Sequence, residues 1–387
     1  MKKLTKNLVL PVLVLMLVAI AVFCVPSYNR AFADTAEGTA RAEILLDFGT
    51  GQVLNEKDSH THLPIASVTK LTTLLLAFEA IDRGEMTLDQ KLAASKTAAG
   101  MGGSQVFIDA GAEYEVANLL HAIIISSAND ASVMIAENLA GSEQNFVEMM
   151  NERVRELGGN DTNYGNCTGL PCATAYSCAF DVALVMRQVL THPIYYEISG
   201  IWMEDFAHPS GRVTQMANTN KLLRSYGGCD AGKTGSTSEA GFCLSASAKR
   251  GDLRLIAVVL GAENSKARFG ECAKLLDYGF DNFTTQCVLS KDSNIDGLAL
   301  DVRNAKNVPL IRAEKDYFTL NKRGEEKTLD VAYEVYAITA PLMAGDVVGK
   351  AIITNDGVVV SEIDLILAND VEAKTVWDNF RTIAGNW

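Results

Sequence analysis

Apolar residues recur at helical spacing in several segments of the chain. In residues 67–84, Leu71, Leu74, Leu75 and Phe78 follow the i, i+3, i+4, i+7 pattern that places one apolar stripe along a helix. Gly84 ends this segment, because glycine readily adopts the backbone conformation that terminates a helix. The same kind of pattern predicts further helices over residues 116–141 (with a break near 126–129), 143–159, 181–193 and 267–283.

Strand signals flank this helical region. Residues 41–56 predict two short strands around a turn at Thr50-Gly51, and residues 241–263 predict two strands around a polar turn. Strands at both ends of the segment, with helices inserted between them, predict one α/β domain over residues 38–284.

A second, strand-rich block covers residues 288–367. Its clearest part is the segment 347–367, where Asn355-Asp356-Gly357 is a strong hairpin signal between two apolar runs that partly alternate. We therefore expect a small β domain after the α/β domain.

The last residues, 370–387, predict an amphipathic helix. Its apolar face carries Trp377 and Trp387, and such aromatic side chains suit a membrane interface. Its polar face has only Lys374 and Arg381 as cations, with several acids nearby. A membrane-surface helix and a helix packed on its own domain are therefore equal alternatives.

The N-terminal segment predicts export. A lysine-rich start precedes an uncharged run over residues 8–25, and Ala31 and Ala33 are small residues at the two positions that a signal peptidase reads. We expect a signal peptide over residues 1–33 and an extracytoplasmic protein, in the cell wall or at the outer face of the cytoplasmic membrane. An uncleaved membrane anchor is the alternative, because the run approaches the length of a membrane span.

The charge balance argues against one class of partner. The chain has 34 Lys and Arg against 47 Asp and Glu, and its net charge of −13 argues against nucleic acid, whose phosphates require a basic surface.

Of the eight cysteines, only Cys24 lies in the predicted signal peptide, so an odd number follows it. Neither the cysteines nor the five histidines show a recognisable metal-ligand spacing. We expect no metal or other cofactor, and mostly buried cysteines with room for one or two disulfides.

Three short motifs carry the candidate chemistry. Ser-x-x-Lys over 67–70 opens the first predicted helix, Ser-Ala-Asn over 127–129 falls at the helix break, and Lys-Thr-Gly over 233–235 precedes the last two strands. Each motif is common alone, and the first could be a helix cap beside a solvated lysine. In this order, the three form the signature of penicillin-interacting serine enzymes.

The first two motifs supply the residue types of a serine nucleophile and its base. A serine hydroxyl attacks a carbonyl well only when a base takes its proton. Ser67 and Lys70 are about one helical turn apart, on the same face. Lys70 can act as the base if burial and a second cation, for which we expect Lys233, lower its pKa. Ser127 can relay a proton toward the leaving amine.

The remaining motif residues fit substrate binding. Asn129 can hold the lysine base and a substrate peptide bond, and Lys233 with Thr234 can bind a terminal carboxylate. Gly235 leaves a strand edge open to close approach. The N–H of Ser236 can pair with that of the nucleophile as an oxyanion hole.

Longer stretches around the motifs resemble the D-alanyl-D-alanine carboxypeptidases, the low-molecular-mass penicillin-binding protein family. These stretches are PIASVTKLTTLLLA, SSANDASVMIAENLAGSEQNFVEMMN, LGGNDTNYGNCTGLP, NTNKLLRSYGGCDAGKTGSTSEAGFCL and CAKLLDYGF. The resemblance implies the penicillin-binding/β-lactamase-like transpeptidase fold, an antiparallel sheet with a helical cluster. A small C-terminal β domain and a terminal amphipathic helix often follow in this family. Two departures are Cys167, where a proline is usual, and Ala231 before the third motif.

The resemblance also implies roles for individual residues. It places the nucleophile at Ser67, the proton acceptor at Lys70 and a proton relay at Ser127. It places Lys233 in substrate binding and suggests that Arg268 helps to hold the substrate carboxylate, for which an exposed structural arginine is the alternative.

The implied reaction is acyl transfer without a metal. Ser67 attacks the peptide bond between two D-alanines at the end of a peptidoglycan stem pentapeptide, D-alanine leaves, and water hydrolyses the acyl-enzyme. Penicillin and other β-lactams would mimic the substrate and acylate the same serine.

Two alternative functions stay open. A class A-like β-lactamase would need a deacylating glutamate, which residues 160–171 lack. A non-catalytic scaffold that binds the cell wall would have no use for an activated serine–lysine pair.

Overall fold

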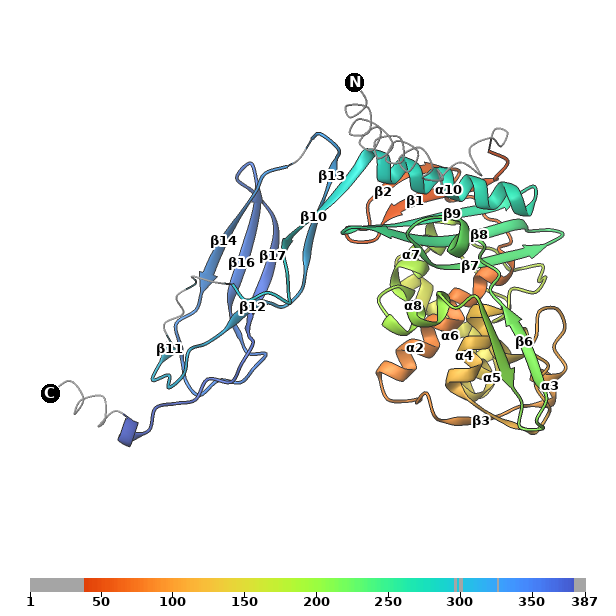
Figure 1. Cartoon of the computed structure of the whole chain (residues 1–387), viewed down its shortest axis with the longest axis horizontal. Helices are drawn as coiled ribbons and strands as arrows, with labels where there is room; N and C mark the ends of the chain where they lie inside the picture. Colours follow the sequence, from red (N-terminus) through yellow and green to blue (C-terminus); the bar gives the residue numbers. More distant parts are fainter. Residues whose placement is uncertain (1–37, 296–297, 299–301, 326, 379–387) are drawn as a thin grey trace, which may run out of the picture.

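Figure 1 shows a computed structural model of the chain, which describes residues 38–295, 298, 302–325 and 327–378. A mixed α/β part is followed by a β-rich part, drawn in cyan to blue. This order agrees with the expected penicillin-binding fold and its C-terminal β domain. The predicted signal peptide lies outside the described residues, as does the end of the predicted C-terminal helix.

The α/β part is built on a five-stranded antiparallel sheet with the order β2-β1-β9-β8-β7. Both predicted strand pairs are confirmed, since the sheet contains β1 (Ala42–Asp47) with β2 (Val53–Lys57) and β8 (Gly241–Arg250) with β9 (Leu253–Ala262). The third motif lies on β7 (Cys229–Thr237), which is an edge strand and therefore has only one strand neighbour.

Helices cover both faces of this sheet (Figure 1). One face packs against α10 (Ser265–Asn282) through a cluster of buried side chains from β8, β9 and this helix. The other face packs against a helical cluster with the larger apolar core. That cluster consists of α2 (Lys70–Asp82), α4 (Val116–Ile125), α5 (Asn129–Ala140), α6 (Glu143–Glu156), α7 (Ala179–Val189) and α8 (Pro193–Ser199).

Short elements complete the α/β part. They are α3 (Lys96–Ala99), α9 (Leu222–Ser225), the pair β3 (Lys91–Ala93) and β4 (Glu113–Glu115), and the pair β5 (Met203–Ala207) and β6 (Val213–Ala217).

The helix predicted from Ser67 begins differently. Residues Ala66–Thr69 form a 3-10 turn, η1, and the α-helix α2 starts only at Lys70. Ala66 has a φ of +48°, so the chain bends sharply just before the serine. The predicted stripe of Leu71, Leu74, Leu75 and Phe78 is at most 1% exposed. It anchors α2 in the core, which fixes the position of the turn that carries Ser67.

The break predicted near 126–129 is confirmed. It separates α4 from α5, and within it Ser127 has a φ of +63°. This left-handed conformation costs energy for a residue with a side chain, and it persists where the surrounding structure imposes it.

The β-rich part contains a four-stranded sheet with the order β12-β17-β16-β14 and smaller strand pairs. The predicted hairpin is confirmed: Asp356 and Gly357 both have positive φ and form the two-residue turn that joins β16 to β17. The strands are β10 (Phe283–Leu289), β11 (Val302–Arg303), β12 (Ile311–Ala313), β13 (Tyr317–Lys322), β14 (Leu329–Val335), β15 (Ile338–Thr339), β16 (Val347–Asn355) and β17 (Val358–Leu367).

The segment predicted as a C-terminal helix begins as extended chain. Val371 and Ala373 form isolated bridges with Leu342 and Ala305, and only residues 376–378 of the described chain are helical there. The extended start follows from these pairings with the β-rich part. Among the described residues, none of the helices has the length and apolar character needed to cross a membrane.

Candidate active site

The Ser-x-x-Lys motif forms a contact pair at the junction of η1 and α2. The Nζ of Lys70 lies 3.0 Å from the Oγ of Ser67, and the lysine side chain is fully buried. Ser67 lies on the 3-10 turn η1, and Lys70 is the first residue of the helix α2 that follows. The predicted contact is therefore present, although a 3-10 turn rather than an α-helical turn produces it.

Lys70 has two further acceptors, and neither carries a charge. Its Nζ donates to the Oδ1 of Asn129 and to the carbonyl oxygen of Thr168, each at 2.6 Å. Burial lowers the pKa of Lys70 from 10.5 to about 7, and the carboxylate of Asp130 acts in the opposite direction. At neutral pH a large fraction of Lys70 is thus free to accept a proton.

Lys233 is the second buried lysine of the site. Its Nζ donates to the Oγ of Ser127 at 2.7 Å and to the carbonyl oxygen of Thr234 at 3.1 Å. Burial holds the pKa of Lys233 well below its usual value, and the positive charges of Lys70 and Arg268 lower it further. We expected burial and this second cation to lower the pKa of Lys70. Burial is the largest cause at both lysines.

Asn129 is fixed between the lysine and a neighbouring loop. Its Oδ1 accepts from Lys70, while its Nδ2 donates to the carbonyl oxygen of Gly102 at 2.7 Å. The expected contact with Lys70 is confirmed. Because both ends of the amide are occupied, the side chain is preorganised.

Gly235 lets β7 lie directly against the nucleophile's turn. A Cβ at this position would come within 2.6 Å of the carbonyl oxygen of Ile65 and 2.9 Å of the backbone N of Ser67. We expected Gly235 to leave room for a close approach to the strand. The segment around η1 occupies that room. Ser236, the next residue of β7, is exposed.

Thr234 and Arg268 contact the chain around the third motif. The Oγ1 of Thr234 donates to the Oγ1 of Thr219 at 2.7 Å, a partner that no sequence motif indicated. Arg268 is only 8% exposed, so the alternative of an exposed structural arginine is wrong. Its guanidinium donates to the carbonyl oxygens of Gly235 at 3.1 Å and Cys243 at 3.3 Å, and burial lowers its pKa to about 10.

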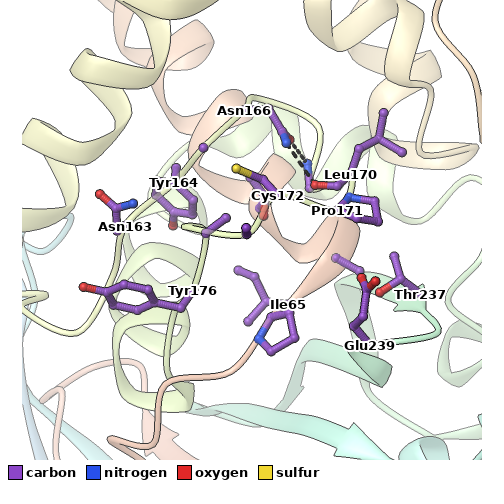
Figure 2. A pocket seen from close by; sticks show the side chains of 17 residues that line it. Ile65, Asn163, Tyr164, Asn166, Leu170, Pro171, Cys172, Tyr176, Thr237 and Glu239 are labelled. Carbon is purple, nitrogen blue, oxygen red and sulfur yellow. Dashed lines mark hydrogen bonds between the residues drawn. The ribbon is translucent and has the colours of Figure 1, made fainter.

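A loop over residues 163–171 supplies the Thr168 carbonyl, and Asn166 shapes it. The Oδ1 of Asn166 accepts from the backbone N–H groups of Thr168 (3.1 Å) and Gly169 (2.7 Å). Its Nδ2 donates to the carbonyl oxygen of Leu170 at 2.9 Å, as Figure 2 shows. Gly169 is required here, since a Cβ would lie 1.9 Å from the carbonyl oxygen of Ala66. Sequence reasoning missed Asn166, although asparagine followed closely by glycine is typical of turns, and Gly169 lies three residues after it.

Cys167, the departure from the family pattern, is buried in this loop. Its backbone N–H and its thiol both donate to the Oε1 of Glu143, at 3.0 and 3.1 Å. All seven cysteines in the described part of the chain are unpaired, so the expected one or two disulfides do not form there.

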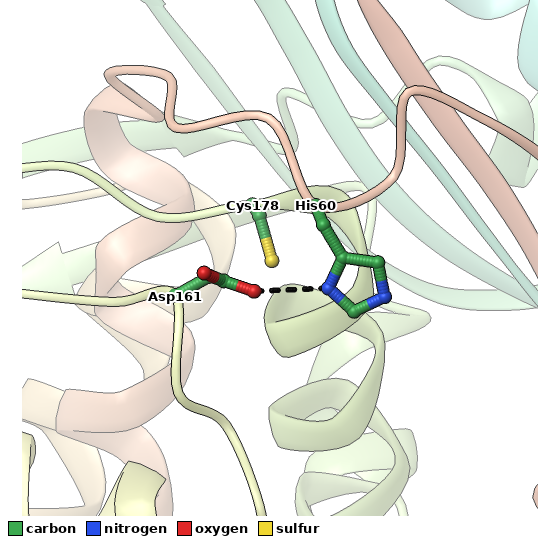
Figure 3. Close-up of side chains that lie close together, drawn as sticks. All are labelled: His60, Asp161 and Cys178. Atoms are coloured by element: carbon green, nitrogen blue, oxygen red, sulfur yellow. Dashed lines mark hydrogen bonds and ion pairs between the residues drawn. The ribbon is translucent and has the colours of Figure 1, made fainter.

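A separate cluster of potential metal ligands lies near this loop (Figure 3). Donor atoms of His60, Asp161 and Cys178 lie within 4.8 Å of one another. Asp161 bonds to the Nδ1 of His60 at 2.9 Å and to the Nε2 of His62 at 3.0 Å, while the thiol of Cys178 accepts from the N–H of Asp181. These bonds join the chain before η1 to the chain after α6. The cluster draws on three distant segments, so its ligand spacing is not visible in the sequence.

Comparison with known proteins identifies the class of this site. A family profile described as D-alanyl-D-alanine carboxypeptidase matches residues 29–264, and one described as penicillin-binding protein 5, C-terminal domain, matches residues 283–373. The chain therefore belongs to the D-alanyl-D-alanine carboxypeptidase family, and it is a serine-type peptidase.

Individual relatives match over most of their length. The chain is 35% identical to the D-alanyl-D-alanine carboxypeptidase DacF of Bacillus subtilis over 351 residues, which cover 90% of both chains. It is 33% identical to DacC of Escherichia coli over 365 residues, again 90% of both. Penicillin-binding protein 5 from Haemophilus influenzae superposes with a TM-score of 0.66 and 30% identity, covering 88% of this chain and 99% of that one. The fold expected from the sequence is thereby confirmed.

Proposed function

We propose that the protein is a serine-type D-alanyl-D-alanine carboxypeptidase that removes the terminal D-alanine from peptidoglycan stem pentapeptides through an acyl-enzyme on Ser67. The observation that carries this proposal is the pairing of Ser67 with Lys70, 3.0 Å apart, in a site where burial brings the lysine pKa to about 7. With a pKa of 10.5, less than about 0.1% of a lysine is neutral at pH 7, whereas at a pKa of 7 about half is neutral.

Acylation begins with a proton transfer. Neutral Lys70 takes the proton of Ser67 as the serine oxygen attacks the carbonyl carbon of the penultimate D-alanine. The backbone N–H groups of Ser67 and Ser236 stabilise the oxyanion that forms. Gly235 supports this arrangement, because its lack of a side chain lets β7 lie close to the N–H of the nucleophile.

Collapse of the tetrahedral intermediate requires a proton on the leaving amine. Ser127, which bonds to Lys233, serves as the relay that passes to the amine the proton that Lys70 took from Ser67, so that D-alanine leaves as a neutral amine and Lys70 is neutral again. Water then attacks the acyl-enzyme, Lys70 again acts as the base, and Ser67 is regenerated.

Substrate orientation comes from the third motif. Lys233 and Thr234 bind the terminal carboxylate, and Asn129 holds the peptide bond while it positions Lys70. Arg268 donates to the backbone of β7, so we assign it a positioning role: it fixes Gly235 and adds positive potential where the carboxylate binds.

Penicillin acylates the same serine, and slow release of that acyl group separates the protein from a β-lactamase. In the described structure the hydrogen-bond acceptors of Lys70 are a hydroxyl, an amide and a carbonyl. A class A-like enzyme would place a glutamate here to activate water. This environment favours the carboxypeptidase.

The parts of the chain have separate tasks in this proposal. Residues 1–33 direct export, residues 38–284 are catalytic, and residues 288–367 form a β domain that carries the catalytic part. The C-terminal segment 370–387 contacts the membrane surface, so that the enzyme works at the outer face of the cytoplasmic membrane. The family acts on peptidoglycan, which supports this location.

Three assays test the proposal. Purified protein should release D-alanine from diacetyl-L-Lys-D-Ala-D-Ala and should take up a fluorescent penicillin, and Ser67→Ala should lose both activities while it remains folded. Nitrocefin should acylate the protein slowly and in stoichiometric amount. Rapid multiple turnover of nitrocefin would favour the β-lactamase, and a folded wild-type protein without labelling would favour a non-catalytic scaffold.

A further inference from the structure

A pocket of about 490 Å³ lies beside the nucleophile's turn (Figure 2). Three segments line it: residues 64–66 with Thr69, the loop 163–176, and the end of β7 at Thr237 with Glu239 just after it. Ala66 precedes the nucleophile and Thr237 is the last residue of the strand that carries the third motif. The pocket therefore adjoins the site of acyl transfer.

The position of the pocket along β7 decides which part of the substrate reaches it. In the proposed function, Lys233 and Thr234 hold the terminal carboxylate, and the scissile carbonyl lies beside Ser236. An extended peptide placed along an exposed strand edge continues in a fixed direction. The residues before the two D-alanines must therefore run past Thr237, toward this pocket.

The lining has the chemistry for a long side chain that ends in a cation. Ile65, Leu170 and Pro171 offer apolar surface. Glu239 is the sole carboxylate among the 17 lining residues, and no lysine, arginine or histidine is among them. Figure 2 shows Glu239 with Thr237 at one end of the pocket and Asn163 with Tyr176 at the other.

The walls are held in place before a ligand arrives. Asn163 and Tyr176 exchange two backbone hydrogen bonds of 2.9 and 3.0 Å, and the ring of His62 stacks on Tyr176 with centroids 4.2 Å apart. On the opposite side, the N–H of Ala240 donates to the Oγ1 of Thr237 at 3.0 Å, which fixes the turn that carries Glu239. A preorganised pocket loses less entropy on binding.

We propose that this pocket binds the side chain of the stem-peptide residue that precedes the two D-alanines, and that Glu239 pairs with a free ammonium on that side chain. The ligand class is an L-configured diamino acid with an unmodified terminal amine. This inference rests on the proposed function, since the direction of the substrate follows from the assigned carboxylate site.

Two substrates that differ in one charge test the pairing. Nα-acetyl-L-Lys-D-Ala-D-Ala keeps the ε-ammonium, whereas the diacetyl peptide neutralises it. Because Glu239 is exposed, wild-type kcat/KM should favour the charged peptide by only about two- to five-fold. Glu239→Gln should bring the ratio to about one by slowing only the charged peptide, and Glu239→Lys should reverse the preference.

Controls separate the pocket from general charge effects and from the proposed function itself. Glu334→Gln removes an exposed carboxylate on β14, in the β-rich part, and should leave the ratio unchanged. Equal kcat/KM for both peptides in the wild type, or an equal loss on both in Glu239→Gln, would overturn the pairing. Failure to cleave either peptide, together with no penicillin labelling, would instead overturn the proposed function.

Discussion

Lys233 and Ser127 lie 106 residues apart in the sequence and are joined by a hydrogen bond of 2.7 Å. This bond connects the edge strand of the sheet to the break between two helices of the cluster. The backbone of Ser127, with its φ of +63°, presents the hydroxyl to the lysine. The strained residue therefore coincides with the proposed proton relay, as is common for strained residues at functional sites.

Acylation should depend on pH through Lys70. Only neutral Lys70 accepts the serine proton, and its pKa is about 7. We expect the second-order rate of penicillin labelling to rise about tenfold per pH unit below pH 7 and to level off above it. Stopped-flow or quenched labelling between about pH 5 and 9 measures this, and a flat profile would exclude Lys70 as the base.

The same lysine should make stability depend on pH. Unfolded Lys70 holds its proton up to about pH 10.5, whereas folded Lys70 loses it near pH 7, so the unfolded chain binds more protons between these values. The wild type should therefore gain stability as pH rises through this window, by up to a few kcal/mol. Lys70→Met lacks this titration and is inactive.

Urea unfolding of both proteins at about pH 6 and pH 9 provides the measurement. The free energy of unfolding of the wild type should increase relative to Lys70→Met at the higher pH. A constant difference between the two proteins would show that the lysine titrates normally in the folded state.

Gly235→Ala should damage the site through its backbone. The new Cβ would meet the carbonyl oxygen of Ile65 at 2.6 Å, so either β7 or η1 must move. We expect a loss of about 1–3 kcal/mol in stability and slower labelling by penicillin. Gly227→Ala is a matched control, because no atom lies within 4 Å of its Cβ and its φ is ordinary for an L-residue. If both variants behave alike, packing at position 235 is not critical.

Asn166→Ala should loosen the loop that supplies the third acceptor of Lys70. The substitution leaves two partly buried backbone N–H groups without their partner, which costs about 1–3 kcal/mol. Penicillin labelling should slow as the carbonyl of Thr168 moves. Asn166→Asp keeps the acceptor oxygen but not the donor to Leu170, and it should fall between the wild type and the alanine variant. Thermal unfolding and labelling rates together check this order.

The sequence predicted those contacts of the site that join residues close to each other in the chain. Ser67 and Lys70 are three residues apart, and their contact follows from any helical turn. The meeting of Lys233 with Ser127 was predictable only because the three motifs occur together. Asn166, Thr219 and Glu239 act through segments that are distant in sequence, and their role depends on how those segments pack. The 3-10 turn at 66–69 lies close against Gly235 of β7, and the apolar periodicity of α2 does not predict this contact.

The strand order of the central sheet determines how much of the chain must be synthesised before the active site can form. Strand β1 lies between β2 and β9, so residues 42–47 pair with residues 255–260. A growing polypeptide cannot close this sheet until about residue 262 has been synthesised, and such distant pairings are slow to form. Incomplete chains therefore cannot hold β7 against the nucleophile. Catalysis therefore requires that the whole unit, from β1 to β9, has been synthesised and has folded.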